Sequence, residues 1–276
     1  MAGILYLVPT PIGNLNDISP RARQTLADAD FLACEDTRVS LKLLNHLQLK
    51  KPLVSYHEHN KAESGQKVLA RLLAGETCAL VTDAGSPAIS DPGEDLVRLC
   101  AENGVTVCAI PGPCALVTAL SISGLPTGRF TFEGFLSVNK KCRQAHLTGL
   151  KDETRTMIFY EAPHKLLTTL QDLAAAFGGE RRISLCRELT KLHEEVRRTT
   201  LAEACAYYAE NAPRGEFVLV VDGAKEAAGD GCTFDEALAL VRERIAGGLS
   251  TKDAAKQVAA ATGYPKNQLY DAILKG

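Results

Sequence analysis

The sequence lacks the short motifs that identify several large enzyme classes. It contains no G-x-G-x-x-G, which argues against a Rossmann dinucleotide site, and no G-x-x-x-x-G-K-[ST], which excludes a P-loop. It also contains no G-x-S-x-G, so a hydrolase with a nucleophile elbow is excluded. Any ligand site must therefore be built from other loops.

The sequence also lacks a long apolar run. The first such run, Ile4 to Val8, stops at Pro9 and follows no basic segment, so it is too short for a signal peptide or a membrane span. No Asn-x-Ser/Thr sequon is present. We therefore expect a cytoplasmic protein that does not associate with membranes.

Paired cysteine motifs are absent as well. The cysteines are odd in number and scattered, and none forms a C-x-x-C pair. Most have apolar neighbours, as in Cys78 to Val81, which is typical of reduced thiols that pack as small hydrophobic groups. The pattern predicts a reducing compartment, with neither a disulfide framework nor a zinc site. The nine cysteines are Cys34, Cys78, Cys100, Cys108, Cys114, Cys142, Cys186, Cys205 and Cys232.

The segment His57-Glu58-His59 is the one place where a metal site deserves consideration. Two imidazoles at i and i+2 of an extended strand would lie on the same face. However, no third ligand is near in the sequence, so a polar loop rim is the favoured interpretation and no metal is expected.

The chain has almost no net charge, because its basic and acidic residues are nearly equal in number. The 276 residues contain 31 Lys and Arg against 33 Asp and Glu, a formal charge of −2, which excludes a surface that is basic overall. With 46% hydrophobic and 23% charged residues the composition is that of a globular protein, and at ~150 residues per domain the length predicts two domains.

The basic residues that are present gather in two places. Lys140, Lys141 and Arg143 follow the aromatic residues Phe130, Phe132 and Phe135, and the segment 181–198 has six basic and three acidic residues, a net +3. Each cluster alone can be an ordinary solvated face. Beside one crevice, they would attract RNA phosphates.

Short β-rich runs alternate with helical stretches, which predicts an α/β fold. Helix starts are indicated by Ser19-Pro20, by Asp91-Pro92, and by capping-box spacing at Asn60–Glu63, Thr200–Glu203 and Thr233–Glu236. The predicted strands are Ile4–Val8, Phe31–Cys34, Leu53–Tyr56, Cys78–Thr82, Val105–Ile110, Thr156–Tyr160, Ile183–Arg187 and Phe217–Val221.

The strands fall into two clusters separated by the breaker-rich linker 123–128. A second change in composition, at 224–231, is followed only by helices joined by Gly-containing turns, a helix-turn-helix pattern. We therefore predict an N-terminal α/β domain over 1–122, a second α/β domain over 123–225 and a helical tail over 226–276. The tail can be a plain helical subdomain or a nucleic-acid contact.

Five loops rich in glycine and proline adjoin the predicted strands. Each alone can be a tight turn, but several together predict a ligand crevice, because strand carboxyl ends face the ligand in open α/β sheets. A sixth loop, Glu35-Asp36-Thr37-Arg38, is either a helix cap with an incidental salt bridge or a polar crevice rim. The five loops are Pro9–Asn14, Asp83–Pro87, Pro111–Cys114, Glu161–His164 and Ala212–Glu216.

Taken together, these loops resemble those of the ribosomal RNA small-subunit methyltransferase I family, within the tetrapyrrole methylase superfamily. The resemblance spans about 4–222 and extends to the tail. Two departures concern ligand fit: Ser86-Pro87-Ala88 where the family often has Thr-Pro-Gly, and Cys114 where serine is common. The matching segments are Leu5–Leu15 with Asp17-Ile18, Glu35–Arg38, Thr82–Gly93, Ile110–Pro113, Phe132–Leu136, Tyr160–His164 and Arg187–Lys191.

The resemblance implies two α/β domains of the tetrapyrrole methylase type with S-adenosylmethionine in the cleft between them, within a homodimer. It implies methyl transfer to the 2′-hydroxyl of a cytidine in the decoding region of 16S rRNA, on the small ribosomal subunit. A general base would assist a poor nucleophile such as a ribose hydroxyl, and Glu35, Asp36, Glu161 and Glu188 are all candidates.

The resemblance implies the cofactor-binding residues, whereas the catalytic and RNA-binding candidates are predicted from the charged residues of the sequence. The predicted catalytic residues are Asp36, Arg38, Glu161 and Glu188, with Asp36 and Arg38 facing the RNA. The predicted RNA-binding residues are Lys140, Lys141, Arg143, Arg187 and Lys191. The predicted cofactor-binding residues are Pro9, Gly13, Asp83, Gly85, Pro87, Pro111, Gly112, Cys114, Tyr160, Ala162, Pro213 and Gly215.

Two other functions remain open. A methylase of the same fold could act on a small corrin or tetrapyrrole precursor, but such enzymes resemble G-x-G-P-G where this chain has Pro9-Thr10-Pro11-Ile12-Gly13-Asn14. A non-catalytic RNA-binding protein could also keep the fold. The glycine loops on both halves argue against it, because a binder has no need of a cofactor crevice.

Overall fold

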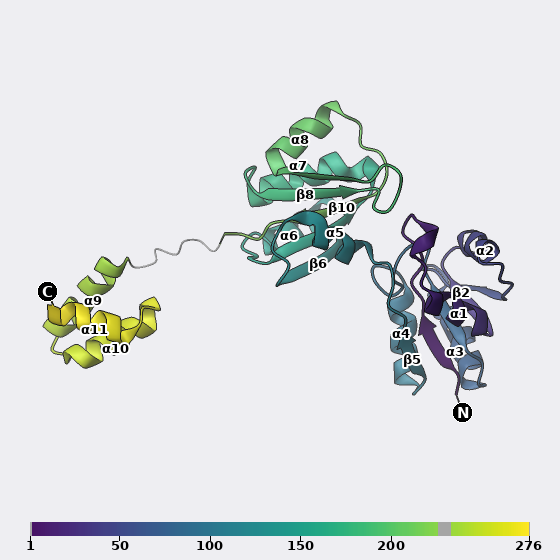
Figure 1. The fold of residues 1–276 in the computed structure, drawn as a ribbon, viewed down its shortest axis with the longest axis horizontal. Coiled ribbons are helices and arrows are strands. Elements are labelled where there is room, and N and C mark those ends of the chain that lie inside the picture. Colours follow the sequence, from purple (N-terminus) through teal and green to yellow (C-terminus); the bar gives the residue numbers. More distant parts are fainter. Residues whose placement is uncertain (1, 226–232, 276) are drawn as a thin grey trace. The chain divides into compact units, whose positions relative to one another are not determined.

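The computed structural model describes residues 2–225 and 233–275, and the chain divides into two units, Met1–Gly223 and Ala224–Gly276 (Figure 1). The first unit contains two β-sheets with their helices, and the second contains helices. The predicted α/β class with a helical C-terminal part is confirmed.

The first sheet is parallel throughout, in the order β3-β2-β4-β1-β5. Alternate residues of β2 pack on opposite faces: Phe31 and Ala33 lie against α3 and α4, whereas Leu32 and Cys34 lie against α1 and α2. Burial on both faces explains the continuous apolar runs of β2 and β4. The bounds are β1 Ile4–Leu7, β2 Phe31–Cys34, β3 Leu53–Ser55, β4 Cys78–Val81, β5 Thr106–Ala109, α1 Pro20–Asp28, α2 Thr37–His46, α3 Lys61–Leu73 and α4 Gly93–Glu102, with a 3-10 turn η1 at Leu15–Asp17.

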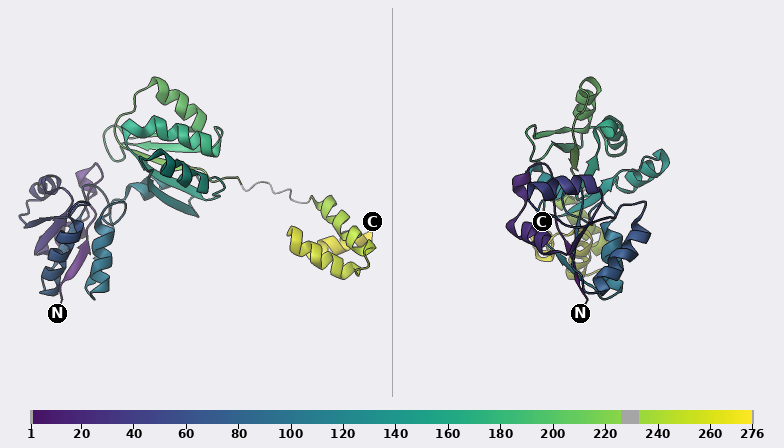
Figure 2. Two further views of the ribbon diagram at one scale, coloured as in Figure 1. Left: turned by 180° about the vertical axis from the view of Figure 1, so that it is seen from behind. Right: turned by 90° about the vertical axis from the view of Figure 1, so that its right-hand side faces the viewer.

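The second sheet is mixed, in the order β6-β7-β10-β8-β9, with β6 and β7 parallel and the other pairs antiparallel. Helix α5 covers one face, and α6, α7 and α8 cover the other (Figure 2). The bounds are α5 Ala115–Ser123, β6 Phe130–Phe135, α6 Lys140–Gly149, β7 Thr156–Glu161, η2 Pro163–Lys165, α7 Leu166–Phe177, β8 Arg182–Arg187, β9 Glu195–Thr200, α8 Leu201–Glu210 and β10 Phe217–Val221.

All eight predicted strands are present, but β6 and β9 were not predicted. Strand β6 contains Gly134 and an irregularity between Phe132 and Gly134, which interrupts the alternation expected of a strand. Strand β9 is a polar edge strand, so its charged side chains resemble a loop. At helix starts, the capping boxes of Thr200 and Thr233 are confirmed.

The capping box predicted at Asn60 is wrong. Asn60 precedes α3, but among the described residues its side chain makes no capping hydrogen bond to that helix. Its Oδ1 instead accepts the backbone N–H of His57 at 2.8 Å, and its Nδ2 donates to the carbonyl of Ser55 at 3.1 Å. The side chain closes the loop that precedes α3.

Helix α5 packs on the second sheet although it precedes the linker at 123–128. Its residues Leu116, Ala119 and Leu120 lie in one buried cluster with Ile158 of β7 and Val218 of β10. The segment Pro111–Cys114 therefore connects β5 of the first sheet to a helix of the second. The division into domains at 1–122, 123–225 and 226–276 stays a prediction.

The second unit holds α9 (Phe234–Ala246), α10 (Thr251–Thr262) and α11 (Lys266–Lys275) around its own apolar cluster, which includes Val241, Val258 and Leu269. Gly263 ends α10 in the left-handed conformation, at the Gly-containing turn that the sequence predicts. Most of the predicted loop at 224–231, and Cys232, lie outside the described residues. In the described parts of the chain no helix is long and apolar enough to cross a membrane.

Candidate ligand-binding site

A cavity of about 570 Å³ lies in the first unit. One part of its wall comes from loops at the carboxyl ends of the parallel strands, where the sequence analysis expects a ligand. The rest comes from the start of α5 and from β6, β7, β10 and the loop after β8. The wall segments are Ile12, Glu35, 82–86, 89–91, 114–115, Phe135, 160–163, Cys186, 188–189, Lys191 and 216–218.

The loop after β1 is braced at three points. Thr10 forms an antiparallel bridge with Gly85, with N···O distances of 2.9 and 3.0 Å in the two directions. Pro9 lies against Gly112, where a Cβ would come within 2.9 Å of the proline Cβ. Gly13 lies against the loop after β8, because a Cβ there would come within 2.5 Å of Lys191 Cγ. The loop is thereby fixed beside the cavity.

Two carboxyl groups, those of Glu35 and Asp83, line the cavity on the side of the first sheet. Glu35 lines the cavity, and its Oε2 accepts a hydrogen bond from Thr82 Oγ1 at 3.3 Å. Burial raises the pKa of Glu35, and the negative charge of Asp83 raises it further. Burial also raises the pKa of Asp83, which likewise lines the cavity. Both carboxyl groups therefore keep their protons to a higher pH than exposed carboxyl groups do.

Asp36 and Arg38 have a different environment. Asp36 caps α2 by accepting the N–H of Arg38 at 2.8 Å, and its carboxylate accepts three further hydrogen bonds from the Arg38 guanidinium. These bonds lower the pKa of Asp36 to about 2. The predicted helix cap with a salt bridge is confirmed. Neither Asp36 nor Arg38 is among the described residues that line the cavity.

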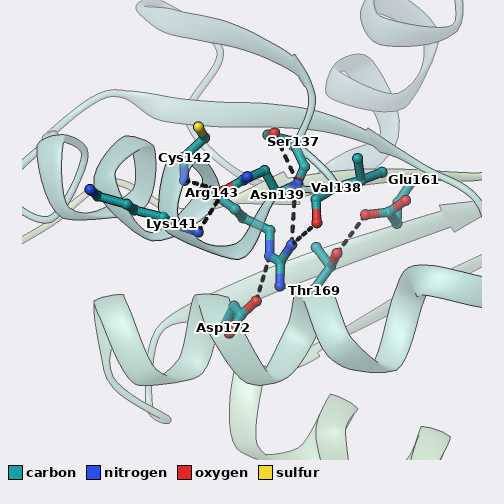
Figure 3. Close-up of polar contacts among 9 residues, drawn as sticks. All are labelled: Ser137, Val138, Asn139, Lys141, Cys142, Arg143, Glu161, Thr169 and Asp172. Atoms are coloured by element: carbon teal, nitrogen blue, oxygen red, sulfur yellow. Dashed lines mark hydrogen bonds and ion pairs between the residues drawn. The ribbon is translucent and has the colours of Figure 1, made fainter.

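The two predicted catalytic carboxylates of the second sheet are engaged in protein contacts. Glu161 is only 4% exposed, and one of its oxygens accepts a hydrogen bond from the N–H of Ala162 at 2.8 Å. The other accepts one from Thr169 Oγ1 at 2.5 Å (Figure 3). Glu188 accepts from Lys191 Nζ at 2.8 Å and from the N–H of Glu216 at 3.0 Å. The contact with Lys191 lowers the pKa of Glu188.

Tyr160 organises the aromatic part of the wall. Its hydroxyl accepts the N–H of Leu116 at 3.1 Å, and its ring lies edge to face with Phe132 and Phe135 at centroid distances of 5.0 and 5.5 Å. Burial raises the pKa of Tyr160 to about 12, so the hydroxyl is neutral at physiological pH. The position of Phe135 on the cavity wall was not predicted, because the bulge that precedes it is not visible in the sequence.

Of the predicted cofactor-binding residues, five line the cavity: Asp83, Gly85, Cys114, Tyr160 and Ala162. The others lie in neighbouring loops and their role stays a prediction. Gly215, for example, lies against the wall residue Glu188, since a Cβ there would come within 2.5 Å of the Glu188 side chain. These other residues are Pro9, Gly13, Pro87, Pro111, Gly112, Pro213 and Gly215.

In two loops of the cavity wall, residues other than glycine have a left-handed backbone conformation, with positive φ. Ala88 and Ser90 have φ of 67° and 63°, and Glu188 and Thr190 have φ of 51° and 65°. Such a backbone is costly for these residue types, and it concentrates at functional sites. Sequence patterns gave no indication of it, because the usual marker of a positive φ is glycine.

The predicted RNA-binding residues differ in availability. Lys140 and Lys141 are exposed in the first turn of α6. The side chain of Arg143 is only 11% exposed, because its guanidinium binds Asp172 Oδ2 at 2.6 Å and the carbonyls of Ser137 and Val138 (Figure 3). The geometry therefore gives no support to the prediction that Arg143 binds RNA.

The positive charge of 181–198 is largely neutralised within the protein. Arg182 pairs with Asp222 at 2.7 Å, Arg187 with Glu195 at 3.3 Å, and Lys191 with both Glu188 and Glu216 at 2.8 Å. Arg198 donates to the carbonyls of Ser123 and Ile122 at the end of α5. RNA contact by Arg187 and Lys191 stays a prediction.

For metal binding, the rings of His57 and His59 lie 6.1 Å apart in an edge-to-face arrangement. In residues 2–225 and 233–275, no three His, Cys, Asp or Glu side chains are grouped so as to hold a metal ion.

Comparison with known proteins places the chain in a family. The model of "Tetrapyrrole (Corrin/Porphyrin) Methylases" matches residues 4–205, and that of the "RsmI C-terminal HTH domain" matches residues 234–276. "Ribosomal RNA small subunit methyltransferase I" of Synechocystis sp. is 50% identical over 99% of this chain and 98% of its own length. The protein of the same name from Pseudomonas aeruginosa is 46% identical, with the same coverage.

Solved structures show the same fold at low sequence identity. Uroporphyrin-III C-methyl transferase from Thermus thermophilus, solved in complex with S-adenosylhomocysteine, is 18% identical with a TM-score of 0.57, over 80% of this chain and 97% of its own. Diphthine synthase is 14% identical with a TM-score of 0.61, over 80% of this chain and 90% of its own.

Proposed function

Because the chain belongs to the ribosomal RNA small subunit methyltransferase I family, among the tetrapyrrole methylases, we propose that it methylates 16S rRNA at the 2′-hydroxyl of a cytidine ribose. The methyl donor is S-adenosylmethionine, and the substrate is the decoding region within the small ribosomal subunit. The observation that carries this proposal is the cavity in the first unit, with carboxyl groups on one wall and aromatic and apolar side chains on another.

The residues of the cavity fit S-adenosylmethionine. A volume of about 570 Å³ lies within the range of cofactor sites, which is roughly 300–1,000 Å³. The carboxyl of Asp83 suits the positively charged methionine end of the cofactor, and Tyr160, Phe217 and Val218 suit the adenine ring. Gly85 has φ 86° and leaves the wall free of a side chain.

The cofactor supplies an electrophilic methyl group on a sulfonium. The protein then has to hold the ribose hydroxyl in line with that methyl and to exclude water. These tasks require a rigid wall, which the braced loop after β1 and the bridge between Thr10 and Gly85 provide.

Glu35 is the best placed of the candidate bases to accept the hydroxyl proton. Asp36 is held by Arg38, Glu161 by Ala162 and Thr169, and Glu188 by Lys191, so each carboxylate is already engaged. Glu35 lines the cavity and accepts a single hydrogen bond, from Thr82, within the described residues. Glu35 would take the proton of the ribose hydroxyl as the hydroxyl oxygen gains the methyl group and the sulfur keeps the electron pair of the broken methyl–sulfur bond.

Asp36 and Arg38 remain proposed as residues that face the RNA, since the Arg38 side chain is 87% exposed. The test is methyl transfer to small ribosomal subunits by Asp36→Ala and Arg38→Ala variants. Wild-type rates for both would exclude this role.

One experiment tests the proposed reaction. Labelled S-adenosylmethionine is supplied with small ribosomal subunits, free 16S rRNA or precorrins, and methylated nucleosides are mapped by mass spectrometry. Label on a cytidine ribose of the subunit is expected. Label on a base would refute the 2′-hydroxyl as acceptor, and label on a precorrin alone would favour a small-molecule methylase.

Calorimetry with S-adenosylhomocysteine separates an enzyme from a non-catalytic RNA-binding protein, because only an enzyme needs the cofactor site. Binding is expected, and its absence at millimolar concentration would exclude both methylases. The homodimer, the cytoplasmic location and RNA contact by the C-terminal helices are further parts of the proposal. Sedimentation of the full chain tests the first of these.

A further inference from the structure

We propose that Phe135 is the platform on which the base of the target nucleotide stacks at the cavity. This inference rests on the proposed RNA methylation and specifies how the substrate is held. Many enzymes that modify a nucleotide extrude it from its stack and hold the extruded base between apolar or aromatic groups. The ring of Phe135 is 57% exposed and lies on the cavity wall.

A bulge in β6 directs Phe135 toward the cavity. Phe132 pairs with Ile158, and Phe135 pairs with Tyr160. On β6 the two phenylalanines are three positions apart, whereas their partners on β7 are only two positions apart. In a regular strand, residues three positions apart face opposite sides of the sheet, so without the bulge Phe135 would face away from Phe132. Because of the bulge, Phe132 and Phe135 both pack against Tyr160.

Gly134 makes this bulge possible. Its φ of 62° is costly for any residue with a side chain, and a Cβ there would come within 3.3 Å of Ser90 Oγ. Strand β6 therefore passes close to a loop of the first sheet. Phe135 is the next residue, at the edge of the cavity formed by these loops.

Both the ring on which Phe135 packs and the segment that follows Phe135 are fixed by contacts with the rest of the protein. Tyr160, which supports the ring edge to face at 5.5 Å, is itself fixed by its hydrogen bond to Leu116. Leu136 is 5% exposed and lies in the core on the other face of the sheet. Arg143 then binds the carbonyls of Ser137 and Val138 at 3.0 and 3.2 Å (Figure 3).

Exposure of an aromatic ring to water is unfavourable. A ring that is already rigid also loses little conformational entropy when a base stacks on it. Stacking on such a ring is sequence-tolerant and contributes roughly ten- to hundred-fold to affinity per base. The exposed Lys140 and Lys141 follow Phe135 at the start of α6, where they can contact the phosphates of the same strand. Base and backbone would thus be held by one segment, 135–141.

The test compares Phe135→Ala with Phe135→Trp and with the control Phe130→Ala. Phe130 is a second exposed phenylalanine of β6, but it pairs with Thr156, four positions along β7 from Tyr160 and therefore about 13 Å away. Steady-state methylation of small ribosomal subunits gives KM and kcat, and calorimetry gives the affinity for S-adenosylhomocysteine.

For Phe135→Ala we expect KM for the subunit to rise about ten- to hundred-fold while the affinity for S-adenosylhomocysteine stays within about two-fold. Phe135→Trp and Phe130→Ala should keep KM within about three-fold of wild type. An unchanged KM in Phe135→Ala would overturn the inference. A ten-fold loss of S-adenosylhomocysteine affinity would also overturn it, because the ring would then contact the cofactor.

Failure of the proposed function has a different outcome in the same assay. If the wild-type protein binds S-adenosylhomocysteine but transfers no methyl group to subunits, RNA methylation is refuted, and the role of Phe135 with it. If the wild type is active and the Phe135 variants match it, only the stacking platform is refuted.

Discussion

The hydroxyl of Tyr160 in β7 accepts the backbone N–H of Leu116 at 3.1 Å, at the second position of α5. The residue that precedes this helix, Cys114, makes no side-chain capping bond within the described part of the chain. Tyr160 therefore satisfies an amide that the N-cap side chain usually satisfies. The cavity wall and the start of α5 depend on the same hydroxyl.

Tyr160→Phe should lower the free energy of unfolding by about 1 kcal/mol, because the N–H of Leu116 loses its acceptor. Cys114→Ser supplies a capping hydroxyl and should restore about 0.5–1 kcal/mol in the Tyr160→Phe background. Urea unfolding of the two single variants and the double variant measures both effects. Strict additivity of the two changes would show that they do not act on the same amide.

Glu35→Gln should reduce single-turnover methyl transfer by about 10²–10⁴-fold and remove the acidic limb of the pH–rate profile. In the wild type, burial and the charge of Asp83 raise the pKa of Glu35, so the rate rises with pH until Glu35 is ionised. Asp83→Asn removes that charge, lowers the pKa of Glu35 and should move the limb to lower pH.

Asp36→Asn is the control for this profile. The pKa of Asp36 is about 2, so the group stays ionised over the working range and its loss cannot change the shape of the acidic limb. An acidic limb that persists in Glu35→Gln would show that another group accepts the proton.

Arg143→Met should cost about 2–4 kcal/mol of stability, because Asp172 and two carbonyls lose a donor in a half-buried environment. Lys141→Met, two positions earlier and exposed, should stay within about 0.5 kcal/mol of wild type. Equal effects in denaturant unfolding would contradict the assignment of Arg143 to the interior.

Replacing Lys140 and Lys141 together by alanine should weaken RNA binding and reduce its salt dependence. Each phosphate contact contributes about 0.7–0.9 to the slope of log affinity against log salt, so the slope should fall by about 1.5. Filter binding of 16S rRNA over a salt series measures it. Lys151→Ala, exposed beyond the far end of α6, should leave the slope unchanged if the contacts are local.

Gly85→Ala and Gly104→Ala form a matched pair. Both glycines have positive φ, 86° and 69°, and substitution of each should cost roughly 1–2 kcal/mol. A Cβ at 104 would have no described atom within 4 Å, whereas one at 85 would meet Ile12 Cγ2 at 3.2 Å on the cavity wall. Only Gly85→Ala should therefore weaken S-adenosylhomocysteine binding in calorimetry.

Strands β2 and β4 of the first sheet were predictable because both are buried on both faces and form continuous apolar runs. The glycine and proline loops were predictable from the glycines themselves. Gly85 and Gly112 stand where the backbone comes close to Ile12 and Pro9, so that a side chain would not fit without a shift. Strand β9 was not, because an edge strand of charged residues has the composition of a loop.

Long-range pairing was the main information that the sequence did not contain. Nothing near Arg143 in the sequence indicates that Asp172, on α7, takes its charge, and nothing near 181–198 indicates Asp222 or the end of α5. Local charge counts therefore overestimated the positive surface. The positive φ values of Ala88, Ser90, Glu188 and Thr190 were not visible in the sequence either, because none of these residues is a glycine.

The helices α9, α10 and α11 enclose an apolar cluster that shares no residue with the clusters of the two sheets, over the described residues. Separate cores can melt separately, so heat denaturation of this protein should not follow a single two-state transition. A calorimetric scan should give an enthalpy larger than the van't Hoff value. A melting temperature for the whole chain would then describe neither unit.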